Sequence, residues 1–207
     1  MMPRPDRLLR FSRAQRYAHR AIAVLGGTLL VTGLILYIPS LSLLFARRTL
    51  VEGIHVLAGL LLPLPFLLAL LRPSFRRDLA ALNRFVPSDW TWLRRPGSRG
   101  AQLATGKFNA GQKLAASAFA AAGVVFLGTG LMLLAPGQLH LSPSLREGAT
   151  IVHDSTTLAF LLLLLGHVRL AFRHPEAREA MRTGFVATGY AAEHHARWAE
   201  EQQQGSA

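Results

Sequence analysis

Four long stretches without aspartate, glutamate, lysine or arginine constrain this 207-residue chain more than any other feature. They cover residues 21–46, 53–71, 114–144 and 155–168. A helix needs about 20 apolar residues to cross the hydrocarbon core of a bilayer, and each stretch reaches that length once its flanks are counted. The sequence therefore predicts an all-α integral membrane four-helix bundle. The expected spans are residues 17–39, 50–71, 112–135 and 149–172.

The basic residues indicate how these spans are oriented. The formal net charge is +12, which by composition alone could indicate a nucleic-acid partner. However, 20 of the 23 lysines and arginines lie in the segments 1–20, 72–113 and 169–207. By the positive-inside rule, both termini and the middle segment face the cytoplasm, and we expect the membrane to be a bacterial inner (plasma) membrane. Topology explains the charge, and we expect no nucleic-acid partner.

The chain is expected to divide at about residue 173. Residues 1–173 form the four-span domain, with a kink at Pro63 and Pro65 in the second span. The first span is expected to be uncleaved, because it is longer than the core of a signal peptide. Residues 174–207 are predicted to be a cytoplasmic surface helix with a disordered end from about Gln202.

The chain contains no cysteine. It can therefore hold no thioether-attached haem and no cysteine-ligated iron–sulfur cluster. If electrons pass through the chain, another subunit must deliver them.

Four of the eight histidines lie in or at the ends of the expected spans. Ionisable groups at membrane depth are costly and usually functional. His55 and His153 lie near the outer ends of their spans, whereas His19 and His167 lie near the inner ends. On the fourth span, the two histidines are about 21 Å apart and about 40° apart in azimuth, so they share a face. The other histidines, which we expect to have ordinary roles, are His140, His174, His194 and His195.

This pattern predicts two b-type haems, each held between two imidazoles at one level of the bilayer. His55 and His153 would hold the outer haem, and His19 and His167 the inner one. A zinc site would gather its ligands at one point instead.

The segment GKFNAGQK at residues 106–113 resembles the Gly-Lys-Tyr-Asn-Ala-Gly-Gln-Lys stretch of the cytochrome b (gamma) subunit of membrane-bound formate dehydrogenases. Phe108 replaces the usual tyrosine, and Arg20 stands where a tryptophan is common. Other segments resemble the family in order and spacing, namely residues 16–19, 54–59, 152–153, 166–167 and 194–198.

The resemblance implies a place in a respiratory complex. Formate would be oxidised in a molybdenum- or tungsten-containing catalytic (alpha) subunit, and electrons would pass through an iron–sulfur (beta) subunit to the two haems. A quinone, menaquinone or ubiquinone, would then be reduced at the cytoplasmic side of this subunit. The family's haem ligands match the histidine pairs given above. Its quinone-binding residues match Asn109, Gly111 and Gln112, beside Lys113.

Three other interpretations remain open. A hydrogenase or thiosulfate reductase complex would use a similar cytochrome b with a different electron donor. A transporter or proton channel could use intramembrane histidines, although the first and third spans lack carboxylates and no inverted repeat is apparent. A membrane anchor without cofactors would leave the matched depths of the histidines unexplained.

Overall fold

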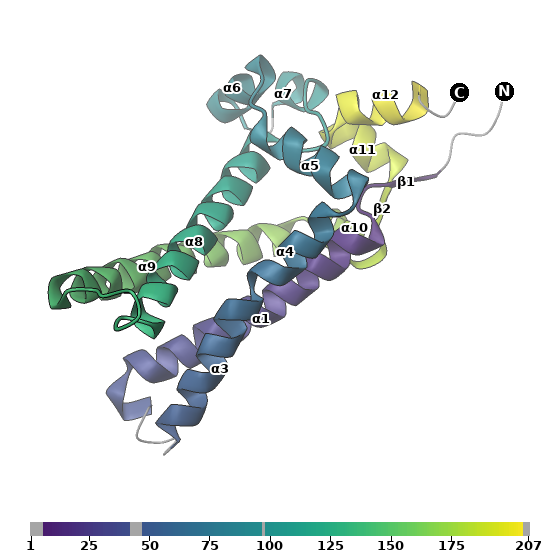
Figure 1. Cartoon of the computed structure of the whole chain (residues 1–207). Coiled ribbons are helices and arrows are strands. Elements are labelled where there is room, and N and C mark those ends of the chain that lie inside the picture. The colour runs from purple at the N-terminus through teal and green to yellow at the C-terminus, as the bar shows by residue number, and fades with distance from the viewer. Residues whose placement is uncertain (1–5, 42–46, 97, 205–207) are drawn as a thin grey trace. The chain divides into compact units, whose positions relative to one another are not determined.

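The computed structural model describes residues 6–41, 47–96 and 98–204, and most of these residues are helical (Figure 1). The longest elements are α1 (Arg13–Tyr37), α3 (Arg48–Leu61) followed by α4 (Pro63–Leu70), α8 (Ala110–Leu134) and α9 (Pro143–Arg173). In the described part of the chain, these are four segments long and apolar enough to cross a membrane, α3 and α4 together forming one of them. The prediction of an all-α membrane protein with four spans is confirmed.

The second span is interrupted at Leu62, between α3 and α4, where the backbone keeps helical angles (φ −55°, ψ −41°), so the predicted kink stays a prediction. Pro63 begins α4, where its missing N–H is not needed because the first N–H groups of a helix have no partner within it. Leu62 donates its N–H to the carbonyl of Gly59 at 3.3 Å, which tightens the last turn of α3.

The long helices carry large aliphatic side chains that are exposed, such as Val24, Leu67, Val124 and Leu162. A soluble protein rarely exposes so much apolar surface, whereas lipid tails cover it without cost. This exposure and the lengths of the helices are those of a membrane protein.

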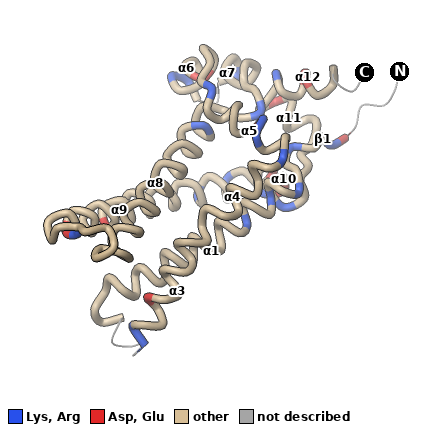
Figure 2. Tube along the Cα trace, viewed as in Figure 1, with Lys and Arg blue, Asp and Glu red and all other residues tan. Residues whose placement is uncertain are grey.

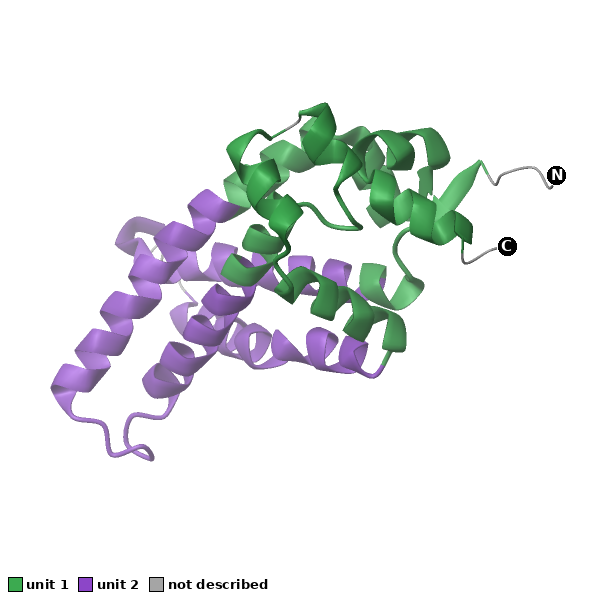
Figure 3. Ribbon diagram, turned by 90° about the horizontal axis from the view of Figure 1, so that it is seen from above, with its two compact units in different colours: residues 1–16, 72–118, 164–207 green, residues 17–71, 119–163 purple. Residues whose placement is uncertain are grey.

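The chain forms two compact units (Figure 3). Unit 1 comprises residues 1–16, 72–118 and 164–207, and unit 2 comprises residues 17–71 and 119–163. The lysines and arginines are concentrated on the segments of unit 1 (Figure 2). The segments of unit 2 contain four basic residues, which are Arg20, Arg47, Arg48 and Arg146.

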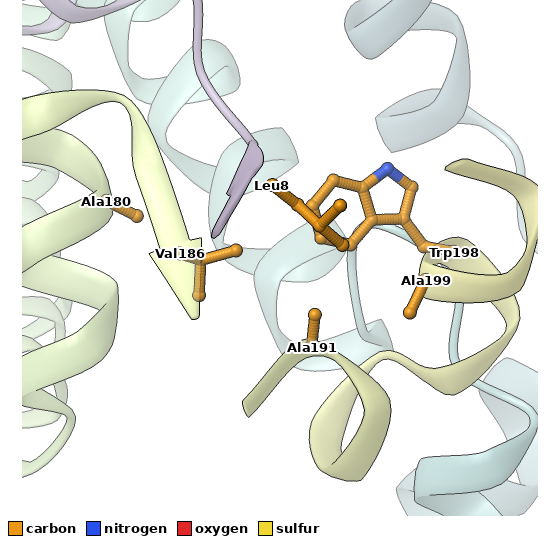
Figure 4. Close-up of a cluster of buried hydrophobic side chains, with 6 residues drawn as sticks. All are labelled: Leu8, Ala180, Val186, Ala191, Trp198 and Ala199. Atoms are coloured by element: carbon orange, nitrogen blue, oxygen red, sulfur yellow. The ribbon is translucent and has the colours of Figure 1, made fainter. Parts of the chain in front are cut away.

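Unit 1 holds short elements that connect or follow the long helices. They are β1 (Arg7–Leu9), α5 (Pro73–Asn83), α6 (Pro87–Arg94), α7 (Arg99–Leu103), α10 (Pro175–Thr183), β2 (Phe185–Ala187), α11 (Thr188–His194) and α12 (Ala196–Gln204). β1 and β2 pair antiparallel, with Leu8 opposite Val186. A small apolar core forms around this pair, made of Leu8, Ala180, Val186, Ala191, Trp198 and Ala199 (Figure 4).

The end of the chain is more ordered than the sequence predicts. Instead of one surface helix and a disordered end from about Gln202, three helices and a strand follow residue 174, and α12 continues to Gln204. The cause is the core, because Trp198 on α12 is only 4% exposed and packs in the cluster that contains Leu8 and Val186. The last part of the predicted tail, residues 205–207, lies outside the described residues.

Gly184 is necessary for the turn between α10 and β2. It ends α10 in the left-handed region, with φ of 98°, which glycine adopts without the cost that a side chain adds. A Cβ atom there would lie 2.7 Å from the carbonyl oxygen of Phe11. That closeness lets the Gly184 carbonyl accept hydrogen bonds from the N–H groups of Arg10 and Phe11 at 2.8 and 3.1 Å.

Candidate functional site

The structure brings together two of the four predicted ligand histidines. In unit 2, the rings of His55 on α3 and His153 on α9 have centroids 6.4 Å apart and planes at 60°. A metal–imidazole bond is about 2 Å long, so two imidazoles on opposite sides of one metal have ring centres about 6 Å apart. The spacing of the two rings fits a single iron between them.

A threonine hydroxyl contacts one nitrogen of each ring. Thr32 Oγ1 lies 2.9 Å from Nδ1 of His55, and Thr129 Oγ1 lies 2.7 Å from Nδ1 of His153. Each hydrogen bond occupies Nδ1, so Nε2 is the nitrogen left to bind a metal.

Glycines line the same rings. A Cβ atom on Gly33 would lie 3.4 Å from Cε1 of His55, and one on Gly130 would lie 3.8 Å from Cε1 of His153. These are ordinary van der Waals distances, so the backbone of both helices lies directly beside the two imidazoles. Phe126 adds an aromatic wall, with its ring edge-on to His153 at 5.1 Å.

The two halves of this site are a repeat within the chain. The pattern Thr-Gly-Leu-x-Leu-x-x-Pro occurs at residues 32–39 and again at residues 129–136, which is 97 positions later. His55 follows Thr32 by 23 residues and His153 follows Thr129 by 24. The hairpins α1–α3 and α8–α9 therefore repeat in the same direction along the chain. The sequence analysis looked for an inverted repeat and missed this parallel one, which an alignment of the chain with itself reveals.

The other predicted pair is divided between the two units. His19 lies on the part of α1 that belongs to unit 2, and His167 lies on the part of α9 that belongs to unit 1. α9 is one continuous helix, so it carries both His153 and His167 as expected. The pairing of His19 with His167 stays a prediction.

Two of the predicted quinone-binding residues cap the start of α8. The backbone N–H of Asn109 donates to Oε1 of Gln112 at 3.1 Å, and the backbone N–H of Gln112 donates to Oδ1 of Asn109 at 2.9 Å. This reciprocal arrangement is a capping box. It uses the side-chain carbonyl oxygens, so each amide NH₂ group is the part that can donate to a ligand.

The other two predicted quinone-binding residues pack α8 against α6. A Cβ atom on Gly111 would lie 2.9 Å from the ring of Trp92, so this glycine lets the indole approach the backbone of α8. Lys113 donates from Nζ to Oδ2 of Asp89 at 2.6 Å and to the carbonyl of Arg84 at 2.9 Å. Both ions are buried, with side chains 7% and 6% exposed. Their part in binding quinone stays a prediction.

The loop before α8 is held by buried polar groups from distant segments. Lys107 Nζ lies 2.7 and 2.6 Å from the carboxylate oxygens of Asp78, which also accepts a hydrogen bond from Gln15. Burial lowers the pKa of Lys107, while the contact with Asp78 acts in the opposite direction. Arg10 donates to the carbonyl of Lys107 at 2.7 Å, and burial lowers its pKa to about 10.

His195, one of the histidines expected to have an ordinary role, also holds this loop. Its Nδ1 lies 2.9 Å from the carbonyl of Gly106, and burial lowers its pKa to about 3. It is therefore neutral at physiological pH and donates Nδ1–H to that carbonyl.

A cavity of about 410 Å³ opens beside this loop in unit 1. Its lining combines aliphatic and aromatic surface with basic groups, from Ala80, Ala81, Arg84, Val86, Gly106, Lys107, Phe108, Lys113 and Arg197. Such a lining fits a flat apolar ring that carries hydrogen-bond acceptors. Of the four predicted quinone-binding residues, Lys113 lines this cavity. The other three lie in the sequence between Phe108 and Lys113, which both line it.

The comparisons with known proteins support an electron-transfer role. The family model described as prokaryotic cytochrome b561 matches residues 10–184, which include both candidate histidine pairs and the whole 106–113 motif. No curated protein matches the chain.

The Lys113–Asp89 pair offers a test of the tie between α6 and α8. Lys113→Met leaves the Asp89 carboxylate buried without its cation, which is expected to destabilise the protein by about 3 kcal/mol. Thermal unfolding of the purified protein measures the loss. Lys113→Met combined with Asp89→Asn is expected to recover most of it, because the side-chain amide is uncharged and keeps an oxygen for the N–H of Val86, which Asp89 accepts at 2.8 Å. Arg99→Met, at an exposed site, is the control. A single Lys113→Met variant as stable as the control would contradict the structural role.

Proposed function

The chain belongs to the prokaryotic cytochrome b561 family, and from this premise we propose that it is the dihaem cytochrome b subunit of a formate dehydrogenase complex. Membership of the family makes it a membrane protein that binds haem b and transfers electrons. The complex is inferred from the GKFNAGQK motif at residues 106–113, which resembles that of the formate dehydrogenase gamma subunit. The partners would be an iron–sulfur (beta) subunit and a molybdenum- or tungsten-containing catalytic (alpha) subunit.

The observation that carries the proposal is the meeting of His55 and His153 at a ring-centre distance of 6.4 Å. We assign the outer haem to this pair and the inner haem to His19 and His167. A haem between two imidazoles is six-coordinate and carries one electron at a time. The chain's own contribution is to orient the imidazoles through the hydroxyls of Thr32 and Thr129.

We assign quinone reduction to the cytoplasmic end of the bundle. The amide NH₂ groups of Asn109 and Gln112 are suited to hydrogen-bond the carbonyl oxygens of menaquinone or ubiquinone. The adjacent cavity of about 410 Å³ is lined by apolar surface from Phe108 and by basic groups. Formate oxidation would take place in the alpha subunit, so this chain would carry the quinone-reduction site alone.

A cytochrome b of a hydrogenase or thiosulfate reductase complex is the second candidate. The family match does not distinguish it from the first, and Phe108 departs from the tyrosine of the formate dehydrogenase motif. The histidine pairs would serve the same purpose there, and only the electron donor would differ.

Orientation in the membrane is tested with single cysteines, because the natural chain has none. We propose that both termini and the 72–113 segment face the cytoplasm, as the basic residues indicate. Ser144→Cys is then expected to react with a membrane-impermeant maleimide in spheroplasts. Arg99→Cys is expected to react only after permeabilisation. Both positions are exposed, so access to the reagent decides the outcome. The opposite labelling pattern would reverse the orientation.

The ligand assignment is tested by reduced-minus-oxidised spectra of the purified chain. His55→Ala or His153→Ala is expected to remove about half of the b-type α-band, because a haem with one axial ligand missing is released or altered. His19→Ala or His167→Ala is expected to remove the other half. His140→Ala and His174→Ala are controls that keep both haems. A colourless wild-type chain would favour a transporter or channel instead, and persistence of both haems in His55→Ala would overturn the pairing.

The electron donor is tested by isolating the complex from native membranes through a tag on this chain. We expect two larger subunits to copurify, one with iron–sulfur clusters and one with molybdenum or tungsten. Added formate is then expected to reduce the haem bands, because the electrons have a path from the alpha subunit. Reduction by hydrogen gas, or copurification of a thiosulfate reductase, would assign the chain to the second candidate instead.

A further inference from the structure

We propose that Thr32 and Thr129 are matched positioning residues, which hold His55 and His153 with the ring proton on Nδ1 and lower the reduction potential of the haem between them. This inference rests on the proposed function, because it concerns the outer haem. It assigns a role to two hydroxyls that the motifs of the chain do not identify.

The direction of each hydrogen bond follows from counting protons. A hydroxyl has one proton, and Thr32 places its own within reach of the Thr28 carbonyl at 2.7 Å. Thr129 does the same with the Val125 carbonyl, also at 2.7 Å. Both carbonyls lie one turn back on the same helix, where threonine commonly donates in membrane helices. If that proton stays directed at the carbonyl, each Oγ1 accepts and Nδ1–H of the histidine donates to it, which is also the tautomer that leaves Nε2 for iron. The His55 ring has a further hydrogen-bond partner in the backbone of Leu29.

The direction of this hydrogen bond decides which tautomer each imidazole adopts. A neutral imidazole has one ring proton, and placing it on Nδ1 leaves the lone pair of Nε2 for iron. Donation from Nδ1–H also makes the imidazole a more basic ligand. A more basic ligand stabilises ferric over ferrous iron, and the potential is therefore lower than it would be without the hydroxyl.

Both threonines are buried, with 7% and 8% of their surface exposed. Water therefore has little access to replace the hydroxyl, and the clearest effect is expected for Thr129, because the Leu29 backbone stays as a second partner of His55. β-Branching also restricts the side chain of a helical threonine to few rotamers, so the oxygen is aimed at the ring before a haem binds.

The repeat provides an independent copy of the same arrangement. The two threonines occupy equivalent positions 97 residues apart, each is followed by a glycine, and each contacts the histidine of its own hairpin. Thr28 lacks this second contact in the described hydrogen bonds: it lies one turn before Thr32 and donates to Val24 at 3.0 Å. Donation to a backbone carbonyl is thus common to all three threonines, whereas the contact with a histidine belongs to the repeat.

The experiment is a potentiometric titration of the purified chain with its haems bound. Thr32→Val and Thr129→Val keep the shape of the side chain and remove the acceptor, and each is expected to shift the midpoint potential of the outer haem to a more positive value. Together they are expected to shift it further than either alone. Thr32→Ser and Thr129→Ser restore an oxygen and are expected to return the potential towards that of the natural chain. Thr28→Val is the matched control and is expected to change nothing.

Haem retention gives a second readout in case a valine variant loses the cofactor. Loss of an outer hydrogen-bond partner weakens metal binding by roughly 10- to 100-fold, which a haem titration of the stripped protein measures. Weaker binding in the valine variants that serine rescues supports the inference. Equal loss in valine, serine and Thr28→Val variants would show a packing role and overturn it.

The possible failures are distinguishable. A natural chain without any b-type band would refute the proposed function and this inference together. Normal haem content with unchanged potentials in both valine variants would refute this inference alone and leave the haem assignment in place. The inner haem serves as the internal reference, since its potential is expected to stay constant.

Discussion

Inside a bilayer, every polar group without a partner costs free energy, and this constraint governs the arrangement of unit 2. The imidazoles of His55 and His153 are acceptable there because each hydrogen-bonds a threonine, which in turn uses a backbone carbonyl of its own helix. The proposed haem site would therefore use the same contacts that make the histidines tolerable in an apolar surrounding. In unit 1, where the 72–113 segment is proposed to lie outside the bilayer, buried polar groups are satisfied by charge pairing, as in Lys107–Asp78 and Lys113–Asp89.

Hydropathy predicts the large features of the fold because a span is a long and local signal. The four spans and the break at Leu62 follow from composition and from two prolines. The short elements of unit 1 could not be predicted in this way, because they depend on contacts between residues far apart in the sequence. β1 and β2 have three residues each and join opposite ends of the chain, and no local pattern marks them. α12 is polar in composition and is ordered by the burial of Trp198.

The candidate site is predicted in part. Depth along each span correctly indicated that His55 and His153 would meet, because helix rise converts sequence position into height. The threonines were missed because a hydroxyl in an apolar run is easily satisfied by its own helix, and only the repeat of the pattern that begins with Thr32 and Thr129 marks them. Gly111 and Lys113 show the converse. Both occur in a motif that predicts ligand binding, and both also have a packing role against α6 that only the structure reveals.

The repeat also distinguishes the two proposed haem sites, because it relates the histidines of one pair and not those of the other. His55 and His153 are equivalent positions of the two hairpins, and their threonines and glycines correspond as well. His19 and His167 are not equivalent, since the offsets of 97 and 98 residues that relate the hairpins place Ala116 and Ala69 at the matching positions. The outer haem would therefore have two similar axial environments, whereas the inner one would have two different ones. Potentials follow the surroundings of the ligands, so an asymmetric pair can be tuned independently of the outer haem. Such a difference in potential is what gives electron transfer between two chemically identical cofactors a direction.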